Sequence, residues 1–236
     1  MVAVLGLERK PAVLAGAAVL VVGAFVVVTV LVGAGGVVTG WDRGVWEWFV
    51  GHRSAGWTTV VKEYTYFGNP QRATVIAGVA AGWVGWRRRS WWDGVVIAGT
   101  VAGAAGVGTV VKWVVDRGRP PVGLRLVSET SMSYPSGHAT ATTALVGVLA
   151  LMYMETRPGR GKAVAAGVFG AVVVGLMCAT RLYLGVHWFS DVVGGVLLGS
   201  SAVLIAGVAQ GIRRAGAGEE GDRIESGLGR EEPGVR

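Results

Sequence analysis

The decisive part of the sequence reads KWVVDRGRP at residues 112–120, PSGH at 135–138 and TRLYLGVHWFSD at 180–191. These three motifs concentrate cationic, histidine, serine and carboxylate side chains in a chain of which only 16% is charged. Each motif lies where an apolar run begins or ends. We therefore expect the hydrophobic segments to carry the polar groups to one common surface.

Composition assigns the chain to the membrane class. Of its 236 residues 52% are hydrophobic, and several apolar runs reach roughly the 20 residues that a helix needs to cross a bilayer. The net charge of +7 does not indicate nucleic acid, because the basic residues cluster between apolar runs instead of forming a solvent-facing stripe. The one cysteine, Cys178, excludes an intramolecular disulfide framework and a cysteine metal cluster.

The hydropathy pattern predicts an all-α membrane domain over residues 1–214 with six transmembrane helices. The first apolar run is too long for the core of a signal peptide and is interpreted as an uncleaved span. Aromatic and charged residues are mixed over residues 40–67, which is typical of an interfacial segment. Residues 215–236 are polar and are predicted to be a disordered cytoplasmic tail. The six spans are expected at about residues 11–38, 70–86, 91–111, 138–154, 163–179 and 188–212.

Basic residues predict the orientation of these spans. They gather near the N-terminus, in the turns at residues 87–89 and 155–162, and at the start of the tail. By the positive-inside rule this side is cytoplasmic, so both termini would be cytoplasmic and the three motifs would face outward. The expected location is a cytoplasmic membrane of bacterial type.

Spacing of glycine also bears on helix packing. Small residues four apart allow close approach of membrane helices, and Gly78 with Gly82, Gly99 with Gly103, and Gly195 with Gly199 have this spacing. With 40 glycines in the chain such pairs also arise by chance. The spacing alone is therefore weak support for a helix contact.

The basic residues of the motifs suit a phosphoryl group as ligand. Lys112, Arg119 and Arg181 offer many N–H donors, and the arginine fork matches phosphate oxygens. Residues 136–138 open an expected helix, whose backbone N–H groups and dipole would face the same anion. The three motifs together therefore predict a phosphate site.

Two histidines and one carboxylate suggest the chemistry. His187 and Asp191 lie four residues apart, on one helix face if the helix has begun by then. Asp191 would bind one ring nitrogen of His187 and leave the other free to attack phosphorus, while His138 protonates the leaving oxygen. This predicts transfer through a phosphohistidine, with cations stabilising the transition state and no metal or other cofactor.

At these motifs the chain resembles the type 2 phosphatidic acid phosphatase superfamily, whose lipid phosphate phosphatases share a fold with bacterial acid phosphatases and vanadium haloperoxidases. The motifs span about a third of the chain and depart from the family at Thr180, where serine is usual. The resemblance implies a metal-independent enzyme with His187 as nucleophile, Asp191 as its orienting carboxylate and His138 as general acid. It implies a phosphate-binding set of Lys112, Arg119, Ser136, Gly137 and Arg181.

The substrate remains open at this point. A site at the outer membrane surface suits a phosphate carried on a lipid, such as undecaprenyl diphosphate, phosphatidylglycerophosphate or phosphatidic acid. A lipid phosphotransferase would use the same residues, and a non-catalytic lipid-binding membrane protein could keep the fold. The expected partners are thus the lipid phosphate and the bilayer, without nucleic acid, while the oligomeric state is undetermined.

Simpler interpretations exist for single residues. Lys112 and Arg181, at span ends, could snorkel to the headgroups, and Ser136 could be only a helix N-cap. Asp191 is harder to explain structurally, because a carboxylate within the start of a span is costly. Arg117 and Glu129, in the loop between the first two motifs, are interpreted as solvated charges or headgroup contacts.

Overall fold

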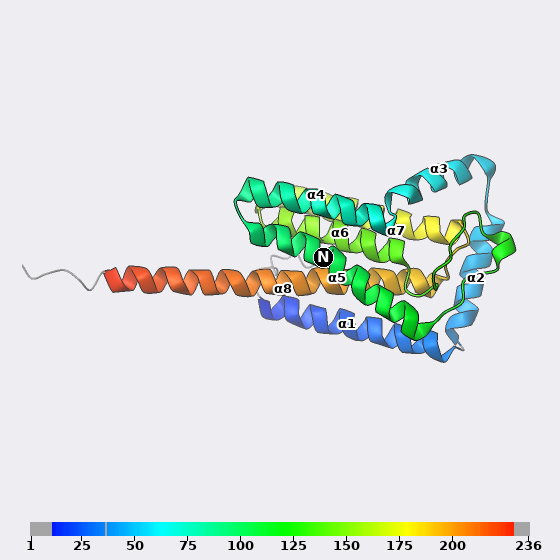
Figure 1. Cartoon of the computed structure of the whole chain (residues 1–236), viewed down its shortest axis with the longest axis horizontal. Coiled ribbons are helices and arrows are strands. Elements are labelled where there is room, and N and C mark those ends of the chain that lie inside the picture. Colours follow the sequence, from blue (N-terminus) through cyan, green and yellow to red (C-terminus); the bar gives the residue numbers. More distant parts are fainter. Residues whose placement is uncertain (1–10, 36, 229–236) are drawn as a thin grey trace, which may run out of the picture.

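The chain folds into a bundle of long helices, seen in Figure 1 with most of their axes along the long direction of the molecule. The computed structural model describes residues 11–35 and 37–228. Within these residues all regular structure is helical: α1 (Pro11–Ala34), α2 (Val37–Gly51), α3 (Ala55–Phe67), α4 (Pro70–Arg88), α5 (Trp91–Val115), the 3-10 helix η3 (Val122–Leu124), α6 (Gly137–Met154), α7 (Arg160–Tyr183) and α8 (Phe189–Leu228).

Five of the helices in the described ranges are long and apolar enough to cross a membrane. They are α1, α5, α6, α7 and the part of α8 from Phe189 to Gly216. The all-α membrane fold is thus confirmed in its coarse form. The expected span at 70–86 forms α4, but Arg72 near its start and Arg88 at its end leave it less apolar than the other five. A sixth span therefore stays a prediction.

The helix ends differ from expectation in three places. The first helix stops at Ala34 and not at residue 38, because Gly35 takes a left-handed conformation with φ of +70°. The segment at 40–67 forms two helices, α2 and α3. The helix α8 continues to Leu228, where a disordered tail was expected from residue 215, since extending an existing helix costs little. Residues 229–236 of the predicted tail lie outside the described residues.

The contact between α6 and α8 is extensive and depends on glycine. A Cβ atom at Gly195 would lie 2.7 Å from the carbonyl oxygen of Ser136, and one at Gly199 would lie 2.8 Å from that of Thr140. Only glycine allows this approach. At Gly99 and Gly103 a Cβ would meet nothing within 4 Å. Equal spacing in the sequence therefore marks a close helix contact on α8 but not on α5.

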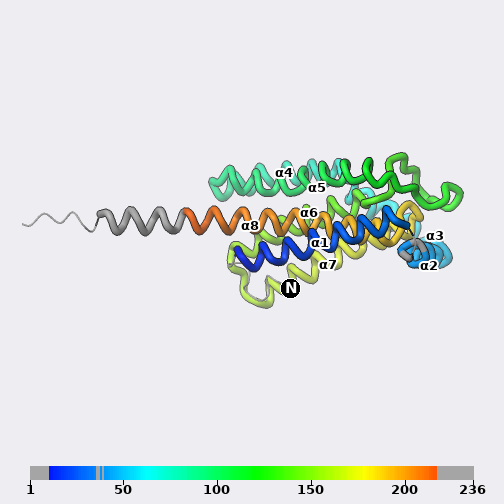
Figure 2. Tube along the Cα trace, turned by 90° about the horizontal axis from the view of Figure 1, so that it is seen from below, coloured from blue at the N-terminus to red at the C-terminus, as the bar shows by residue number. Residues whose placement is uncertain are grey.

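The three motifs and the basic turns lie at opposite ends of the bundle. In Figure 1 the loop after α5, the segment before α8, and α2 and α3 gather at one end, whereas the α4–α5 and α6–α7 connections lie at the other. Figure 2 shows the same separation from a perpendicular direction. The N-terminal basic residues Arg9 and Lys10 lie outside the described residues.

Candidate active site

The site is assembled from helix ends and the loops between them. Backbone hydrogen bonds join these loops: the Ser136 N–H donates to the Asp191 carbonyl at 2.9 Å, and the Leu126 N–H donates to the Leu184 carbonyl at 3.0 Å. The starts of α6 and α8 are thereby fixed to each other. The motifs, which are far apart in sequence, meet at this end of the bundle.

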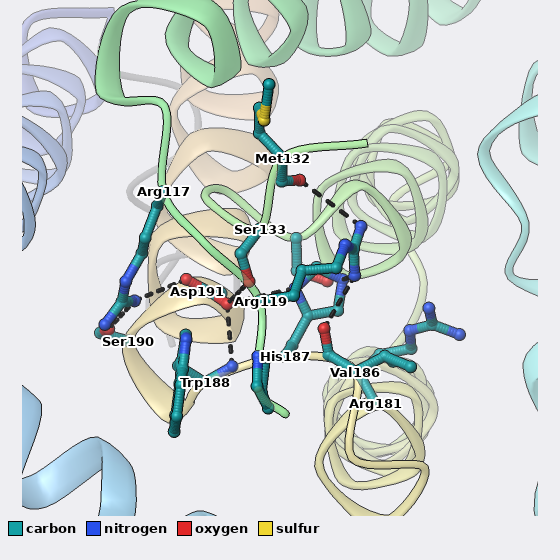
Figure 3. A network of polar contacts seen from close by, with 12 residues as sticks. Arg117, Arg119, Met132, Ser133, Arg181, Val186, His187, Trp188, Ser190 and Asp191 are labelled. Atoms are coloured by element: carbon teal, nitrogen blue, oxygen red, sulfur yellow. Dashed lines mark hydrogen bonds and ion pairs between the residues drawn. The ribbon is translucent and has the colours of Figure 1, made fainter. Parts of the chain in front are cut away.

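His187 is the centre of the arrangement. Its side chain is 1% exposed, its Nδ1 lies 3.2 Å from Asp191 Oδ2, and its Nε2 lies 3.2 Å from Arg119 Nη1. A guanidinium can only donate hydrogen bonds, so Nε2 must accept and therefore carries a lone pair. The ring proton is then on Nδ1, donated to Asp191. Figure 3 shows His187 between Asp191 and Arg119.

The surroundings of His187 keep its ring neutral. Burial lowers the pKa of His187 from 6.5 to about 4, and the positive charges of Arg181 and Arg119 act in the same direction. Asp191 opposes this shift through its hydrogen bond and its charge. At neutral pH the imidazole therefore has an unprotonated Nε2, as a nucleophile requires.

Asp191 is wholly buried and is held by several donors. Its Oδ2 accepts from His187, from the Ser133 hydroxyl and, at 2.8 Å, from the Trp188 N–H. Its Oδ1 accepts from Arg117 Nη1 at 2.6 Å. A carboxylate with both oxygens bound in this way stays ionised and has one orientation.

The three predicted phosphate-binding cations converge on the loop that precedes α6. Lys112 Nζ donates to the Met132 carbonyl at 2.6 Å, and Arg119 Nε donates to the Ser131 carbonyl at 2.7 Å. Lys112 therefore points into the site, and simple snorkelling does not describe it. Arg181, 1% exposed, donates to Thr65 Oγ1 at 3.0 Å and also pairs with Glu129.

Glu129 occupies the position between two of these cations. Its carboxylate pairs with Arg181 and lies 3.7 Å from Arg119 Nη2. Burial acts to raise the pKa of Glu129, but the guanidinium groups of Arg181 and Arg119 lower it more. The carboxylate of Glu129 thus takes the donors that an anionic ligand would need.

The PSGH motif supplies the start of α6. The Ser136 hydroxyl accepts from the Ala139 N–H and so caps the helix, which is the simpler interpretation given above. A Cβ at Gly137 would lie 3.2 Å from Pro70, so this backbone is tightly packed. His138 is 8% exposed, and the positive charges of Lys112, Arg119 and Arg181 act on its ring electrostatically.

Two site residues were misjudged from sequence. Arg117 and Glu129 are not solvated charges, because Arg117 pairs with Asp42 and Asp191, and Glu129 pairs with Arg181. Asp42 was predicted only as one charge of the interfacial segment at residues 40–67 and not as part of the site. The sequence could have indicated Asp42 only as a carboxylate in a segment between two apolar runs, and no spacing relates it to the three motifs.

The described residues contain no group of three or more His, Cys, Asp or Glu side chains suited to hold a metal ion. The polar groups at the site are instead mostly cations and their acceptors. This donor set fits an anionic ligand better than a cationic one.

Comparison with known proteins decides the family. The family model described as the PAP2 superfamily matches residues 93–212, about half of the chain. The chain belongs to the PAP2 superfamily. The matched PAP2 region contains all three motifs, as the resemblance in the sequence indicated.

Individual PAP2 relatives agree with this assignment. The chain is 35% identical to phosphatidylglycerophosphatase B of Bacillus subtilis over 116 residues, which are 47% of this chain and 55% of that protein. It is 34% identical to decaprenylphosphoryl-5-phosphoribose phosphatase of Mycobacterium tuberculosis over 134 residues, 55% of this chain and 67% of that one. The match thus spans about half to two thirds of these relatives.

A solved PAP2 structure extends the similarity to most of the fold. It is the crystal structure of a transmembrane PAP2 type phosphatidylglycerolphosphate phosphatase from Bacillus subtilis, with 25% sequence identity and a TM-score of 0.70. The superposition covers 80% of this chain and 93% of that one. The helices outside the three motifs therefore follow the PAP2 arrangement as well.

Proposed function

We propose that this chain is a membrane phosphatase that removes the phosphate of a lipid through a phosphohistidine at His187. One observation carries the proposal: Nδ1 of His187 lies 3.2 Å from Asp191 Oδ2 while Nε2 lies 3.2 Å from Arg119 Nη1, an arrangement that favours the tautomer with a lone pair on Nε2. PAP2 membership and the phosphatase names of the relatives support it. The roles of the predicted site residues are part of the proposal.

The reaction has two steps. In the first, Nε2 of His187 forms a bond to phosphorus as the bond to the lipid oxygen breaks, and His138 gives its proton to that oxygen. In the second, water attacks phosphorus and the N–P bond breaks, while His138 takes a proton from the water. Lys112, Arg119 and Arg181 stabilise the negative charge of the phosphoryl oxygens, with Ser136 and Gly137 shaping the backbone beside them.

The membrane arrangement is proposed on two grounds. The basic turns and the site lie at opposite ends of the bundle, so the positive-inside rule would place the site outside the cytoplasmic membrane and both termini within the cytoplasm. The helix α4, of 19 residues, packs beside α5 and would be the sixth span. The catalytic domain would comprise residues 1–214, followed by a cytoplasmic tail, with α2 and α3 at the outer interface.

Two substrate classes fit, and the names of the relatives represent both. One is a glycerolipid phosphate such as phosphatidylglycerophosphate, and the other is a phosphate or diphosphate on a polyprenyl chain. Both present a dense anion at the membrane surface, which suits the three cations. The distinction would depend on the groups beyond the phosphate.

A substrate panel tests the proposal. Purified protein in detergent is given phosphatidylglycerophosphate, phosphatidic acid and undecaprenyl diphosphate in EDTA, and inorganic phosphate is measured with and without an added alcohol as acceptor. We expect phosphate release from at least one lipid, and none from H187A. Dependence on a divalent metal would contradict the mechanism, and transfer to the alcohol in place of phosphate release would identify a phosphotransferase.

A further inference from the structure

Arg117 lies between two buried carboxylates. Its Nη1 donates to Asp191 Oδ1 at 2.6 Å and its Nη2 donates to Asp42 Oδ2 at 2.5 Å. The two carboxylate side chains are 0% and 2% exposed, and that of Arg117 is 13% exposed. The guanidinium is thus nearly sealed inside the protein and neutralised from two sides.

Asp42 anchors this arrangement to α2. Its Oδ1 accepts from the Ser190 N–H at 2.7 Å, and its Oδ2 accepts from the Ser190 hydroxyl at 2.8 Å. Asp42 therefore satisfies a free N–H group at the start of α8 from another helix. Asp42 thereby fixes Ser190, the residue next to Asp191. Through its pair with Arg117 it also helps to fix Asp191 itself.

We propose that Arg117 and Asp42 form a positioning pair that sets the orientation and the effective charge of Asp191, and through Asp191 keeps His187 aimed and neutral. The inference rests on the proposed function, because it assigns the pair a role in the same reaction. Neither residue touches the phosphate. Arg117 acts on one oxygen of Asp191 while His187 binds the other, as Figure 3 shows.

The bonding pattern distinguishes Arg117 from the phosphate-binding arginines. Both of its terminal nitrogens are committed to carboxylates, and Nη1 also donates to the Ser190 hydroxyl at 2.7 Å. Burial lowers the pKa of Arg117, but Asp191 and Asp42 raise it more, so the net shift is upward. Three of the five N–H groups of the Arg117 guanidinium are thus bound within the protein, and its planar fork bridges two carboxylates as lysine cannot.

Removing the charge of Arg117 would raise the pKa of His187. Asp191 would be less neutralised and would stabilise the imidazolium more strongly, so the pKa of His187 would rise. The other charged or titratable groups that act on His187 stay in place in such a variant: Arg119 and Glu129 from the loop, Arg181 from α7 and His138 from α6.

The test combines kinetics with histidine titration. The variants are R117Q, R117K, D42N and the double variant R117Q/D42N, with D116N as the matched control, because Asp116 is the exposed neighbour of Arg117. We expect R117Q to lower kcat by about 10- to 100-fold with KM changed less than about 3-fold. D42N should change kcat in the same direction by less, and the double variant should be no worse than R117Q alone. R117K should restore part of the loss, and D116N should resemble the wild type.

NMR titration of the histidine rings gives an independent readout. The chain has three histidines, so H52A and H138A assign the His187 signal. We expect the His187 pKa to rise in R117Q and to stay low in D116N. This readout needs no turnover, so the inference remains testable if the substrate panel fails and the proposed function falls.

Two results would overturn the inference. One is a R117Q variant with raised KM, unchanged kcat and unchanged His187 titration, which would make Arg117 a ligand of the phosphate. The other is full additivity of R117Q and D42N, which would show that the two residues act separately. If R117Q fails to fold, D42N and R117K carry the same comparison, and the absence of any His187 shift in both would reject it.

Discussion

The two ends of the bundle both contain ion pairs, but they differ in charge balance. At the end away from the motifs Arg88 pairs with Glu155 at 2.7 Å and with Asp93 at 3.5 Å, and Arg214 pairs with Glu155 at 2.8 Å. Two cations there face two carboxylates. At the site end four cations, Lys112, Arg117, Arg119 and Arg181, face three carboxylates, Asp42, Glu129 and Asp191.

This difference separates a structural network from a functional one. The distal network, formed by Arg88, Asp93, Glu155 and Arg214, neutralises itself and ties helix ends together. The site network keeps one positive charge in excess and holds a neutral histidine in its centre. Only the second arrangement favours an added anion, so substitutions at the two ends should affect different measurable quantities.

The largest effect is expected from His187. H187A removes the proposed nucleophile and should lower kcat by at least about 1000-fold, because the alanine side chain cannot form the bond to phosphorus. The matched control is H52A, since His52 is exposed and its ring, among the residues that the structure describes, bonds only to the Trp48 carbonyl. Steady-state phosphate release measures both variants, and an H187A enzyme with more than a tenth of wild-type kcat would refute the assigned role.

A smaller loss is expected from the cations of the site. R181Q should reduce kcat/KM by about 100-fold, because a charge-assisted donor to the phosphoryl oxygens is lost. R88Q removes an arginine from the distal network and should leave kcat/KM within about 2-fold while lowering the melting temperature. Equal losses of kcat/KM in R181Q and R88Q would contradict the proposed difference between the site end and the distal end of the bundle.

Substitution of Glu129 should strengthen anion binding, whereas substitution of a site cation should weaken it. Since its carboxylate occupies Arg181 and Arg119, E129Q should free these donors and lower the inhibition constant of orthovanadate, a phosphate mimic, by about 3- to 10-fold. Phosphate release titrated with vanadate measures this. Weaker vanadate inhibition in E129Q would mean that Glu129 supports the site instead of competing for it.

The pH profile sharpens the comparison further. The folded-state pKa of His187, about 4, lies below the ordinary value of 6.5, so the ring stays neutral as pH falls through 6.5. Protonation of the nucleophile should therefore reduce kcat/KM only near pH 4. The same depressed pKa stabilises the fold above pH 6.5, and this contribution should be lost as pH falls from 6.5 toward 4. An acid limb of kcat/KM at pH 6.5 that H138A does not move would contradict the neutral, buried His187.

The smallest effect on activity belongs to Glu155. E155Q removes the acceptor charge shared by Arg88 and Arg214, so the melting temperature should fall by a few degrees. The kinetic constants should stay within about 2-fold of the wild type. Thermal unfolding in detergent measures the first, and phosphate release measures the second.

The sequence predicts that the three motifs come together, but it does not predict the side chains that support them. Motif residues such as His187 and Asp191 could be predicted because they lie four apart in the sequence. His187 nevertheless precedes α8, which begins at Phe189, so the helix had not begun by His187 as that prediction required. Asp42, in α2, lies 75 residues from Arg117, in the loop after α5, and only the tertiary fold brings them together. Glycine spacing failed for the same reason, since Gly99 and Gly195 look alike until their neighbours are known.

The most direct test of the central claim is to trap the intermediate. A lipid substrate labelled in its phosphate is mixed with the enzyme, quenched in alkali to preserve a phosphoramidate bond, and the labelled peptide is identified by mass spectrometry and NMR. We predict label on Nε2 of His187 and none in H187A. Label on another residue or on Nδ1, or no labelled enzyme during rapid turnover, would contradict the account.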